Sequence, residues 1–240
     1  MQKVIEIVKW ILLLSVIVLL MAFSVNKQKL TTCNVFDVEI VSSENDFIDS
    51  KTVEEFLKNK NLHPSGKFRT EIAIDEMEKN IANHPSVQNV NAFSDIRGNI
   101  KVEIKQRNPI VRVQTVNKSF YIDESGKKMP LSEVYTSRVL VITGNVNYYK
   151  IDELFLMSKF ITDSPFWKAQ IMQMHLEENE EITLIPRVGY QQIVFGKPIN
   201  IEEKFRKLKL FYEKGISDKG WNNYSHINLK FKNQIVCTKK

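Results

Sequence analysis

The stretch VQNVNAFSDIRGNIKVEIKQ, residues 87–106, decides how the first half of the chain folds. In residues 100–106, isoleucine and valine alternate with lysine and glutamate, which is the pattern of a strand with one buried face. Residues 87–93 form a second strand pattern, and the turn-forming residues of 95–99 separate the two. The stretch therefore predicts a β-hairpin whose apolar face must be covered by another element.

The residues before the hairpin predict one more strand and two helices that can cover the apolar face of the sheet. Residues 35–41 alternate in the same way and predict a third strand. Asp49 or Ser50 can cap a first helix, and Pro85 stops a second, because proline disfavours helical geometry in the residue before it. The apolar positions are Val53, Phe56 and Leu57 in the first helix and Ile74, Met77 and Ile81 in the second. The predicted order is β-α-α-β-β, with the helix pair on one side of a three-stranded sheet.

The residues after Pro109 are richer in strands. The predicted strands are Ile110–Val116, Phe120–Asp123, Val139–Ile142, Ile171–Leu176, Ile182–Ile185, Ile193–Phe195 and Ile227–Val236. Two predicted helices interrupt them, one carrying Ile151, Leu154, Phe155 and Ile161 and the other Phe205, Leu208, Phe211 and Tyr212. We therefore expect an α+β chain whose second domain is a mainly antiparallel β domain with flanking helices.

The N-terminal segment is apolar over residues 10–23, interrupted only by Ser15. A helix that crosses the hydrocarbon of a bilayer needs about 20 residues, so the span must extend outward toward Val4 and Val25. We expect an uncleaved transmembrane helix over residues 10–25, behind a short cytoplasmic tail of residues 1–9.

Two alternatives to an uncleaved anchor stay open at this point. The apolar run is short, and Ala22 and Ser24 could be the small residues before a signal-peptide cut. Residues 30–33, which end in Cys33, could also be a lipoprotein site, although four polar residues separate that cysteine from the apolar run.

Charge, cysteines and histidines exclude several functions. The formal net charge is +6, but the lysines are interleaved with acids, so we expect no nucleic-acid ligand. Cys33 and Cys237 could form one disulfide, but we expect two unpaired thiols. The four histidines lack metal-ligand spacing, and the acidic residues of 177–181 lie between two strands without a partner base. We therefore expect no metal, no cofactor and no catalytic site.

The last strand pattern, Ile227–Val236, is the candidate binding site. Its apolar and polar residues alternate, and only Asn233 breaks the alternation. If this strand lies at a sheet edge, its unpaired backbone groups can accept a strand from another chain; the alternative is an ordinary interior strand. The candidate partner-binding residues are Leu229, Lys230, Phe231, Lys232, Asn233, Gln234, Ile235 and Val236. Among them Phe231, Ile235 and Val236 are expected to give specificity.

Several short motifs, in order, resemble the FtsQ/DivIB family of bacterial cell-division proteins. They are His84–Val87, Gln106–Ile110, Tyr121–Gly126 with Met129–Leu131, Val141–Gly144 and Ile227–Phe231. Ser86 stands where the family usually has an aromatic residue, and Asn228 and Lys230 replace an acid and an arginine. The resemblance implies a POTRA domain over residues 34–107 and an FtsQ-type β domain over residues 108–237.

The resemblance also implies a function. Such proteins are non-enzymatic divisome scaffolds in the cell inner membrane, with a cytoplasmic N-terminus and periplasmic domains. They link early and late division proteins, and their C-terminal strand recruits FtsB-like and FtsL-like bitopic partners that regulate septal peptidoglycan synthesis. Two alternatives are a membrane-anchored periplasmic enzyme acting on the cell wall and a POTRA-containing component of outer-membrane assembly. The sequence contains neither a catalytic constellation nor a series of membrane strands for them.

Overall fold

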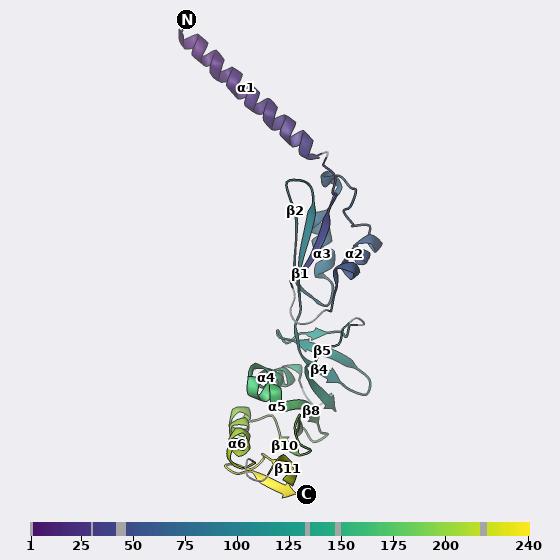
Figure 1. Cartoon of the computed structure of the whole chain (residues 1–240), viewed down its shortest axis with the longest axis vertical. Helices are drawn as coiled ribbons and strands as arrows, with labels where there is room; N and C mark the ends of the chain where they lie inside the picture. Colours follow the sequence, from purple (N-terminus) through teal and green to yellow (C-terminus); the bar gives the residue numbers. More distant parts are fainter. Residues whose placement is uncertain (1, 30, 42–46, 133–134, 147–149, 217–219) are drawn as a thin grey trace. The chain divides into compact units, whose positions relative to one another are not determined.

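The chain divides into two compact units, residues 1–106 and residues 107–240 (Figure 1). The computed structural model describes residues 2–29, 31–41, 47–132, 135–146, 150–216 and 220–240, with the side chains of 2–6, 22–29 and 221 left undescribed. Residue 1 of the predicted tail and residue 30 of the lipoprotein alternative therefore lie outside the described residues, as do the side chains of Val4 and Val25.

The first helix, α1, spans Gln2–Lys29 and contains the predicted residues 10–25. Its described side chains, residues 7–21, are exposed, and Trp10 retains 70% of its accessible surface. Judged on length and apolar content together, none of the helices in the described part of the chain qualifies as a membrane-spanning segment.

The rest of the first unit has the predicted β-α-α-β-β order. Its elements are β1 (Phe36–Val41), α2 (Ser50–Asn59), the 3₁₀ turn η1 (Arg69–Glu71), α3 (Ile74–Ala82), β2 (Val87–Ser94) and β3 (Ile100–Gln106). The strands form a sheet of order β1-β3-β2, in which β1 is parallel and β2 antiparallel to β3. This confirms the predicted order of elements and the three-stranded sheet.

Local side-chain contacts explain where these elements begin and turn. The Asp49 carboxylate accepts a hydrogen bond from the Thr52 N–H at 2.7 Å, so Asp49, one of the two predicted caps, begins α2. The Asp95 carboxylate accepts from the N–H groups of Arg97 and Asn99, both at 2.8 Å, and so closes the β2–β3 turn. The hairpin predicted from residues 87–106 is therefore held by its own turn residues.

The core of the first unit lies between the helices and one face of the sheet. Its buried members are Cys33, Ile48, Val53, Leu57, Met77, Ile81, Val87, Val90, Ile100, Val102 and Ile104. Most of them come from the two helices and the hairpin, and Ile100, Val102 and Ile104 have the buried parity that the alternation predicted. Cys33 and Ile48 lie in the segments before β1 and α2. Gln106 is only 2% exposed and fixes the approach to α2, since its side-chain oxygen accepts from the N–H groups of Phe47 and Ile48 at 2.9 and 3.2 Å.

The second unit is built on one large mixed sheet. Its elements are β4 (Pro109–Gln114), β5 (Ser119–Asp123), β6 (Lys128–Met129), β7 (Leu140–Gly144), α4 (Ile151–Asp163), α5 (Pro165–Gln170), β8 (Ile171–Leu176), β9 (Ile182–Pro186), β10 (Gln192–Gly196), α6 (Ile201–Lys214), η3 (Trp221–Asn223), β11 (Tyr224–Asn228) and β12 (Val236–Lys239). The strand order is β12-β11-β10-β9-β8-β7-β4-β5-β6. The chain is therefore α+β, as predicted.

The pairing within this sheet is mainly antiparallel but includes three parallel contacts. β4 with β7, β7 with β8, and β10 with β11 run parallel, and the other neighbours run antiparallel. The parallel step from β7 to β8 is a crossover through α4 and α5, which a parallel pair requires because a short turn cannot join it. The predictions missed α5 and β6, which are short.

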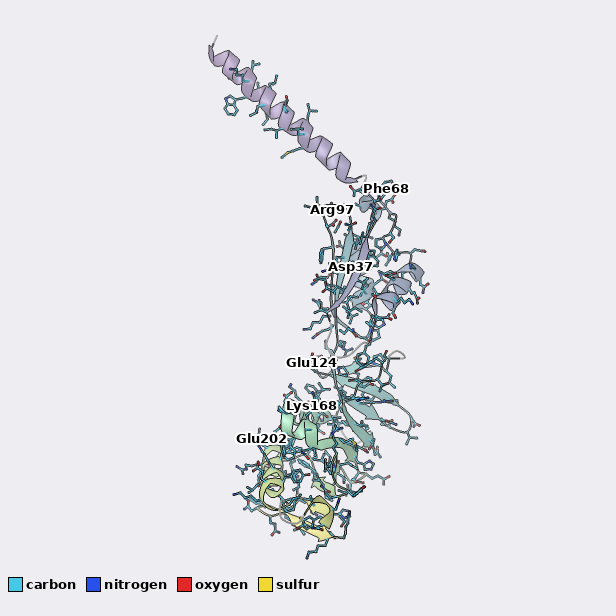
Figure 2. The ribbon with its side chains drawn as sticks, in the orientation of Figure 1. Asp37, Phe68, Arg97, Glu124, Lys168 and Glu202 are labelled. Carbon is cyan, nitrogen blue, oxygen red and sulfur yellow. The ribbon has the colours of Figure 1, made fainter. Side chains whose placement is uncertain are left out.

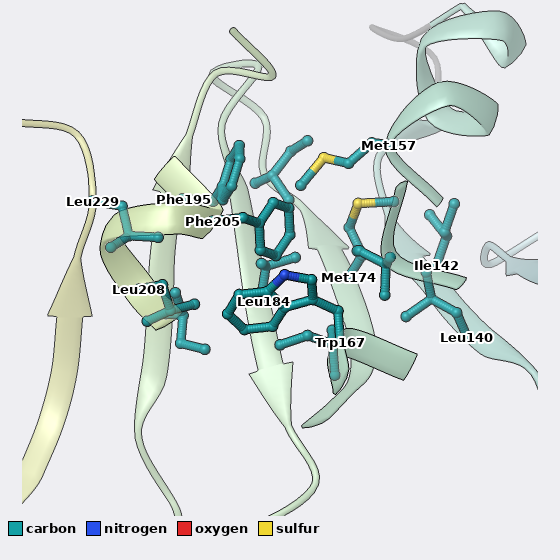
Figure 3. Packing of buried hydrophobic residues seen from close by; sticks show 14 of the residues in the cluster. Leu140, Ile142, Met157, Trp167, Met174, Leu184, Phe195, Phe205, Leu208 and Leu229 are labelled. Atoms are coloured by element: carbon teal, nitrogen blue, oxygen red, sulfur yellow. The ribbon is translucent and has the colours of Figure 1, made fainter. Parts of the chain in front are cut away.

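The three helices α4, α5 and α6 lie on one side of this sheet and cover its apolar face (Figure 1). Figure 3 shows the centre of that core, where Phe205 of α6 lies among residues of the sheet and of α5. The Phe205 ring centroid is 4.8 Å from that of Trp167 and 5.3 Å from that of Phe195. These aromatic contacts fix α6 against β10, and β10 in turn carries β11 and the final strand.

Candidate partner-binding edge

The last strand, β12, forms one end of the large sheet. On its inner side it pairs antiparallel with β11, with Asn228 opposite Val236 and Ile227 opposite Cys237. On its outer side no strand in the described part of the chain pairs with it. In Figure 1 it is the yellow arrow that ends at the C-terminus. β12 is therefore an edge strand of the kind that can accept another chain.

The backbone groups on that outer side can be assigned from the hydrogen bonds. The Leu229 N–H donates to Val194 O of β10 at 2.9 Å, so the preceding residue, Asn228, directs its backbone groups toward β12. Its partner Val236 faces β11 in return. Because alternate residues of a strand face opposite sides, the backbone N–H and C=O groups of Cys237 point outward. The next residue of the same parity, Lys239, lies at a register shift, and its carbonyl accepts from the Ser225 hydroxyl of β11 at 3.4 Å.

The predicted single strand Ile227–Val236 is wrong. β11 ends at Asn228, and the chain folds back through residues 229–235 before β12 begins at Val236. The reason is local: the Asn228 side chain accepts from the Lys230 N–H at 3.0 Å, and Asn233 adopts a positive φ of 60°, both of which interrupt an extended strand. β11 consequently lies inside the sheet, between β10 and β12.

The eight predicted residues occupy different environments. Only Val236 belongs to β12, and Leu229 is fully buried. Ile235 is half-buried and packs against the core, as does Cys237. Phe231 and Val236 keep 44% and 43% of their surface exposed, and Lys230, Lys232, Asn233 and Gln234 are also exposed. Near the sheet edge, the structure therefore places buried Leu229 and half-buried Ile235 beside the exposed apolar side chains of Phe231 and Val236. That these residues bind a partner stays a prediction.

The first unit offers less free backbone at one of its two edges. β2 is an edge strand there, and the Ala92 N–H donates to the Glu78 carboxylate of α3 at 3.3 Å. A side chain of the same unit therefore satisfies one of the groups that an incoming strand would need.

The acidic run between β8 and β9 is a turn, as expected. The Glu177 N–H donates to Glu181 O at 2.9 Å, and the Glu177 carboxylate accepts from the Thr183 hydroxyl at 2.9 Å. His175 Nδ1 lies 2.9 Å from the Thr143 oxygen. These side chains line an open groove of about 1720 Å³ across the ends of β4, β7 and β8. Within the ranges that the structure describes, no three metal-ligating side chains gather into a site.

The two cysteines are free and lie in different units. Cys33 is buried in the first core, where its thiol donates to Val35 O at 3.4 Å, and Cys237 is half-buried on β12. Burial raises the pKa of both thiols. The structure thus has the two unpaired thiols that we expected.

A family model described as FtsQ/DivIB, C-terminal related, matches residues 108–238, more than half of the chain. The chain belongs to the FtsQ/DivIB family. A second model, for a POTRA-like domain, matches residues 31–105 of this FtsQ/DivIB protein. No curated protein matches the chain. The resemblance read from its motifs is therefore confirmed, and family membership indicates a role as a cell-division scaffold.

Two motifs of this FtsQ/DivIB chain, Gln106–Ile110 and Tyr121–Gly126, meet in a buried ion pair. Arg107 Nε lies 2.7 Å from the Asp123 carboxylate, and the other oxygen of Asp123 accepts from the Ser125 hydroxyl and the Lys127 N–H at 2.7 and 2.9 Å. Burial opposes ionisation of Asp123, but the hydrogen bonds from Ser125 and Arg107 outweigh it and lower its pKa. These contacts organise the β5–β6 turn.

Proposed function

We propose that this protein is a non-enzymatic divisome scaffold that recruits FtsB-like and FtsL-like bitopic proteins by strand addition at β12. Through these partners it links early and late division proteins and helps to control septal peptidoglycan synthesis. The observation that carries the proposal is the position of β12 at the end of the sheet, with the backbone groups of Cys237 directed outward.

Side chains must supply the specificity of such an interface. Each added backbone hydrogen bond contributes only about 1 kcal/mol net, and any extended chain can form it. The exposed Phe231 and Val236 offer apolar surface beside the edge. The lysines at 232, 239 and 240 favour an acidic partner and also keep an unoccupied edge soluble.

The proposal includes a membrane anchor, with the N-terminus in the cytoplasm and both folded units in the periplasm. Helix α1 supports this anchor, because its described side chains are exposed and mostly large and apolar (Figure 2). Burying such side chains in lipid is favourable, and Lys9 could reach the headgroups. An anchor in the inner membrane would hold β12 close to bitopic partners in the same membrane.

The proposal also assigns no reaction to the protein. Glu177 and His175, two titratable residues of the open groove, are 3.9 Å apart. Each has a hydrogen-bonding partner among threonines of the sheet, in keeping with a structural role. An enzyme acting on the wall would need an activated acid, base or nucleophile in that position.

A proline substitution tests the strand-addition proposal. Cys237→Pro removes one outward N–H from β12 and places a ring in the path of an added strand, while the inward bonds to β11 remain. We expect the full-length variant to bind an FtsB-like partner about tenfold more weakly, since it loses about 1 kcal/mol per hydrogen bond together with close approach. Binding is measured by co-purification in mild detergent and by bacterial two-hybrid assay.

Cys237→Val is the matched control, because it also removes the thiol but keeps the backbone N–H. We expect it to bind like the wild type. Equal binding by the proline and valine variants, with both folded by circular dichroism, would reject strand addition at β12.

A further inference from the structure

The segment that joins β11 to β12, residues 229–235, is much longer than the two-residue turns that most often join antiparallel strands. A long connection is free to move unless other parts of the fold hold it. Because β12 follows directly at Val236, whatever holds this connection also sets the position of the edge strand.

Two lysines link the connection to two other parts of the unit. Lys230 Nζ lies 3.0 and 3.2 Å from the two carboxylate oxygens of Glu181, in the turn between β8 and β9. Lys207 of α6 donates from its Nζ to Phe231 O at 2.7 Å. These contacts hold the connection between the β8–β9 turn and α6. We call the Glu181–Lys230 ion pair within them the clasp.

The backbone of Glu181 is fixed by hydrogen bonds within the β8–β9 turn. Its N–H donates to the Asn179 side-chain oxygen at 3.2 Å, and its carbonyl accepts from the Glu177 N–H at 2.9 Å. A prearranged acceptor loses less conformational entropy when the ion pair forms than a mobile one would. The Glu181 side chain therefore pairs with Lys230 from a fixed backbone position.

Gly196, the last residue of β10, makes room for the lysine. A Cβ atom at this position would lie 2.7 Å from Lys230 Cγ and 2.9 Å from Cδ, so the stem of Lys230 rests directly on the glycine. The φ angle of Gly196 is +73°, a conformation that other residues rarely adopt. The end of β10 is thus shaped to receive the side chain that reaches Glu181.

We infer that the Glu181–Lys230 ion pair is a positioning contact that fixes β12 for strand addition and makes partner binding depend on ionic strength. The inference rests on the proposed function of β12 and concerns how partner binding at that strand is regulated. The side chains of Lys230 and Glu181 are 41% and 24% exposed, so salt reaches the pair. Raising the salt concentration weakens the clasp and loosens the edge strand.

The test compares Glu181→Gln, Lys230→Met and the charge-swapped double variant Glu181→Lys/Lys230→Glu in the full-length protein in mild detergent. An exposed pair of this kind changes equilibria by about twofold to fivefold. We therefore expect each single variant to bind an FtsB-like partner about threefold more weakly at low salt and like the wild type at high salt. The double variant keeps the net charge and is expected to restore binding.

Glu180→Gln is the matched control. Glu180 lies in the same turn as Glu181 but pairs with Lys197, which follows β10, at 3.0 Å, so its loss should leave partner binding unchanged. Equal weakening by Glu180→Gln, or a charge swap that fails to restore binding, would overturn the inference.

A measurement without any partner separates this inference from the proposed function. The amides of Val236 and Thr238 face β11, and their hydrogen exchange should accelerate about threefold in Glu181→Gln. If exchange accelerates but no partner binds even the wild type, the clasp stands and the proposed function fails. If exchange is unchanged, the clasp is rejected whatever the partner does.

Discussion

Replacing Asp123 with asparagine should destabilise the second unit by about 3 kcal/mol. The side chains of Arg107 and Asp123 are only 13% and 6% exposed, and removing one partner of a buried ion pair costs about 3–5 kcal/mol. The lower end applies here, because asparagine keeps an oxygen that can accept from the Lys127 N–H, and Arg107 keeps its bonds to two backbone carbonyls.

The loss is measured by urea unfolding of the full-length protein in detergent, followed by the fluorescence of Trp167, which is buried in the same unit. Asp163→Asn is the control, since Asp163 pairs with Lys159 but both side chains are about half exposed, and its loss should cost less than about 0.5 kcal/mol. Equal costs for the two variants would refute the structural role given to Asp123.

The same pair gives a prediction for pH. The pKa of Asp123 is lowered in the folded state from its ordinary value of 3.8, so its stabilising effect is fully present above that value and is lost as the pH falls through the lower, folded pKa. The stability difference between the wild type and Asp123→Asn should therefore be constant from neutral pH to about pH 5 and shrink below about pH 4. A difference that stays constant into the acid range would contradict the assignment.

Two further predictions concern the first unit and the topology. Gln106→Leu should cost the first unit about 2–4 kcal/mol, because the buried N–H groups of Phe47 and Ile48 lose the Gln106 oxygen that accepts from both; faster amide exchange at these two residues is the readout. Gln234→Cys, on the exposed connection before β12, should react with a membrane-impermeant thiol reagent once the outer envelope is opened, and reaction only after inner-membrane lysis would reject a periplasmic location.

The first unit could be predicted from the sequence because its signals are local. The alternation in residues 100–106, the cap at Asp49 and the helix stop before Pro85 each act within a few residues, and the structure follows all three. Even the covered face of the sheet follows from the parity of the apolar residues.

The second unit was predictable in its strands but not in their arrangement. Strand order and the parallel contacts of β4, β7 and β8 depend on pairings between distant segments, which no local pattern specifies. The helix α5, Pro165–Gln170, is too short for a helical period to be visible. Glu181 and Lys207, which hold the final connection, were also missed, because alone each reads as an ordinary surface charge.

The C-terminal segment shows most clearly how a local pattern can mislead. Alternation from 227 to 236 favours one long strand, and the break at Asn233 is a single exception in that pattern. In the structure Asn233, with its positive φ, lies in the connection between β11 and β12. The hydrogen bond from the Lys230 N–H to the Asn228 side chain lies where this connection begins. Parity can be kept on both sides of a bend, so alternation alone cannot tell a strand from a hairpin.

This bend changes which residues can serve a partner. A single strand ending at Val236 would itself border β10 and present its own backbone, including that of Phe231, to another chain. Because the chain folds back instead, β11 becomes an interior strand and the outward backbone groups move to Cys237, beyond all eight residues predicted to bind. Phe231 then lies on the connection, where it can contribute apolar surface but no ladder of hydrogen bonds. Substitutions at Phe231 should therefore alter partner preference, whereas those that remove an outward N–H of β12 should weaken every partner that binds by strand addition.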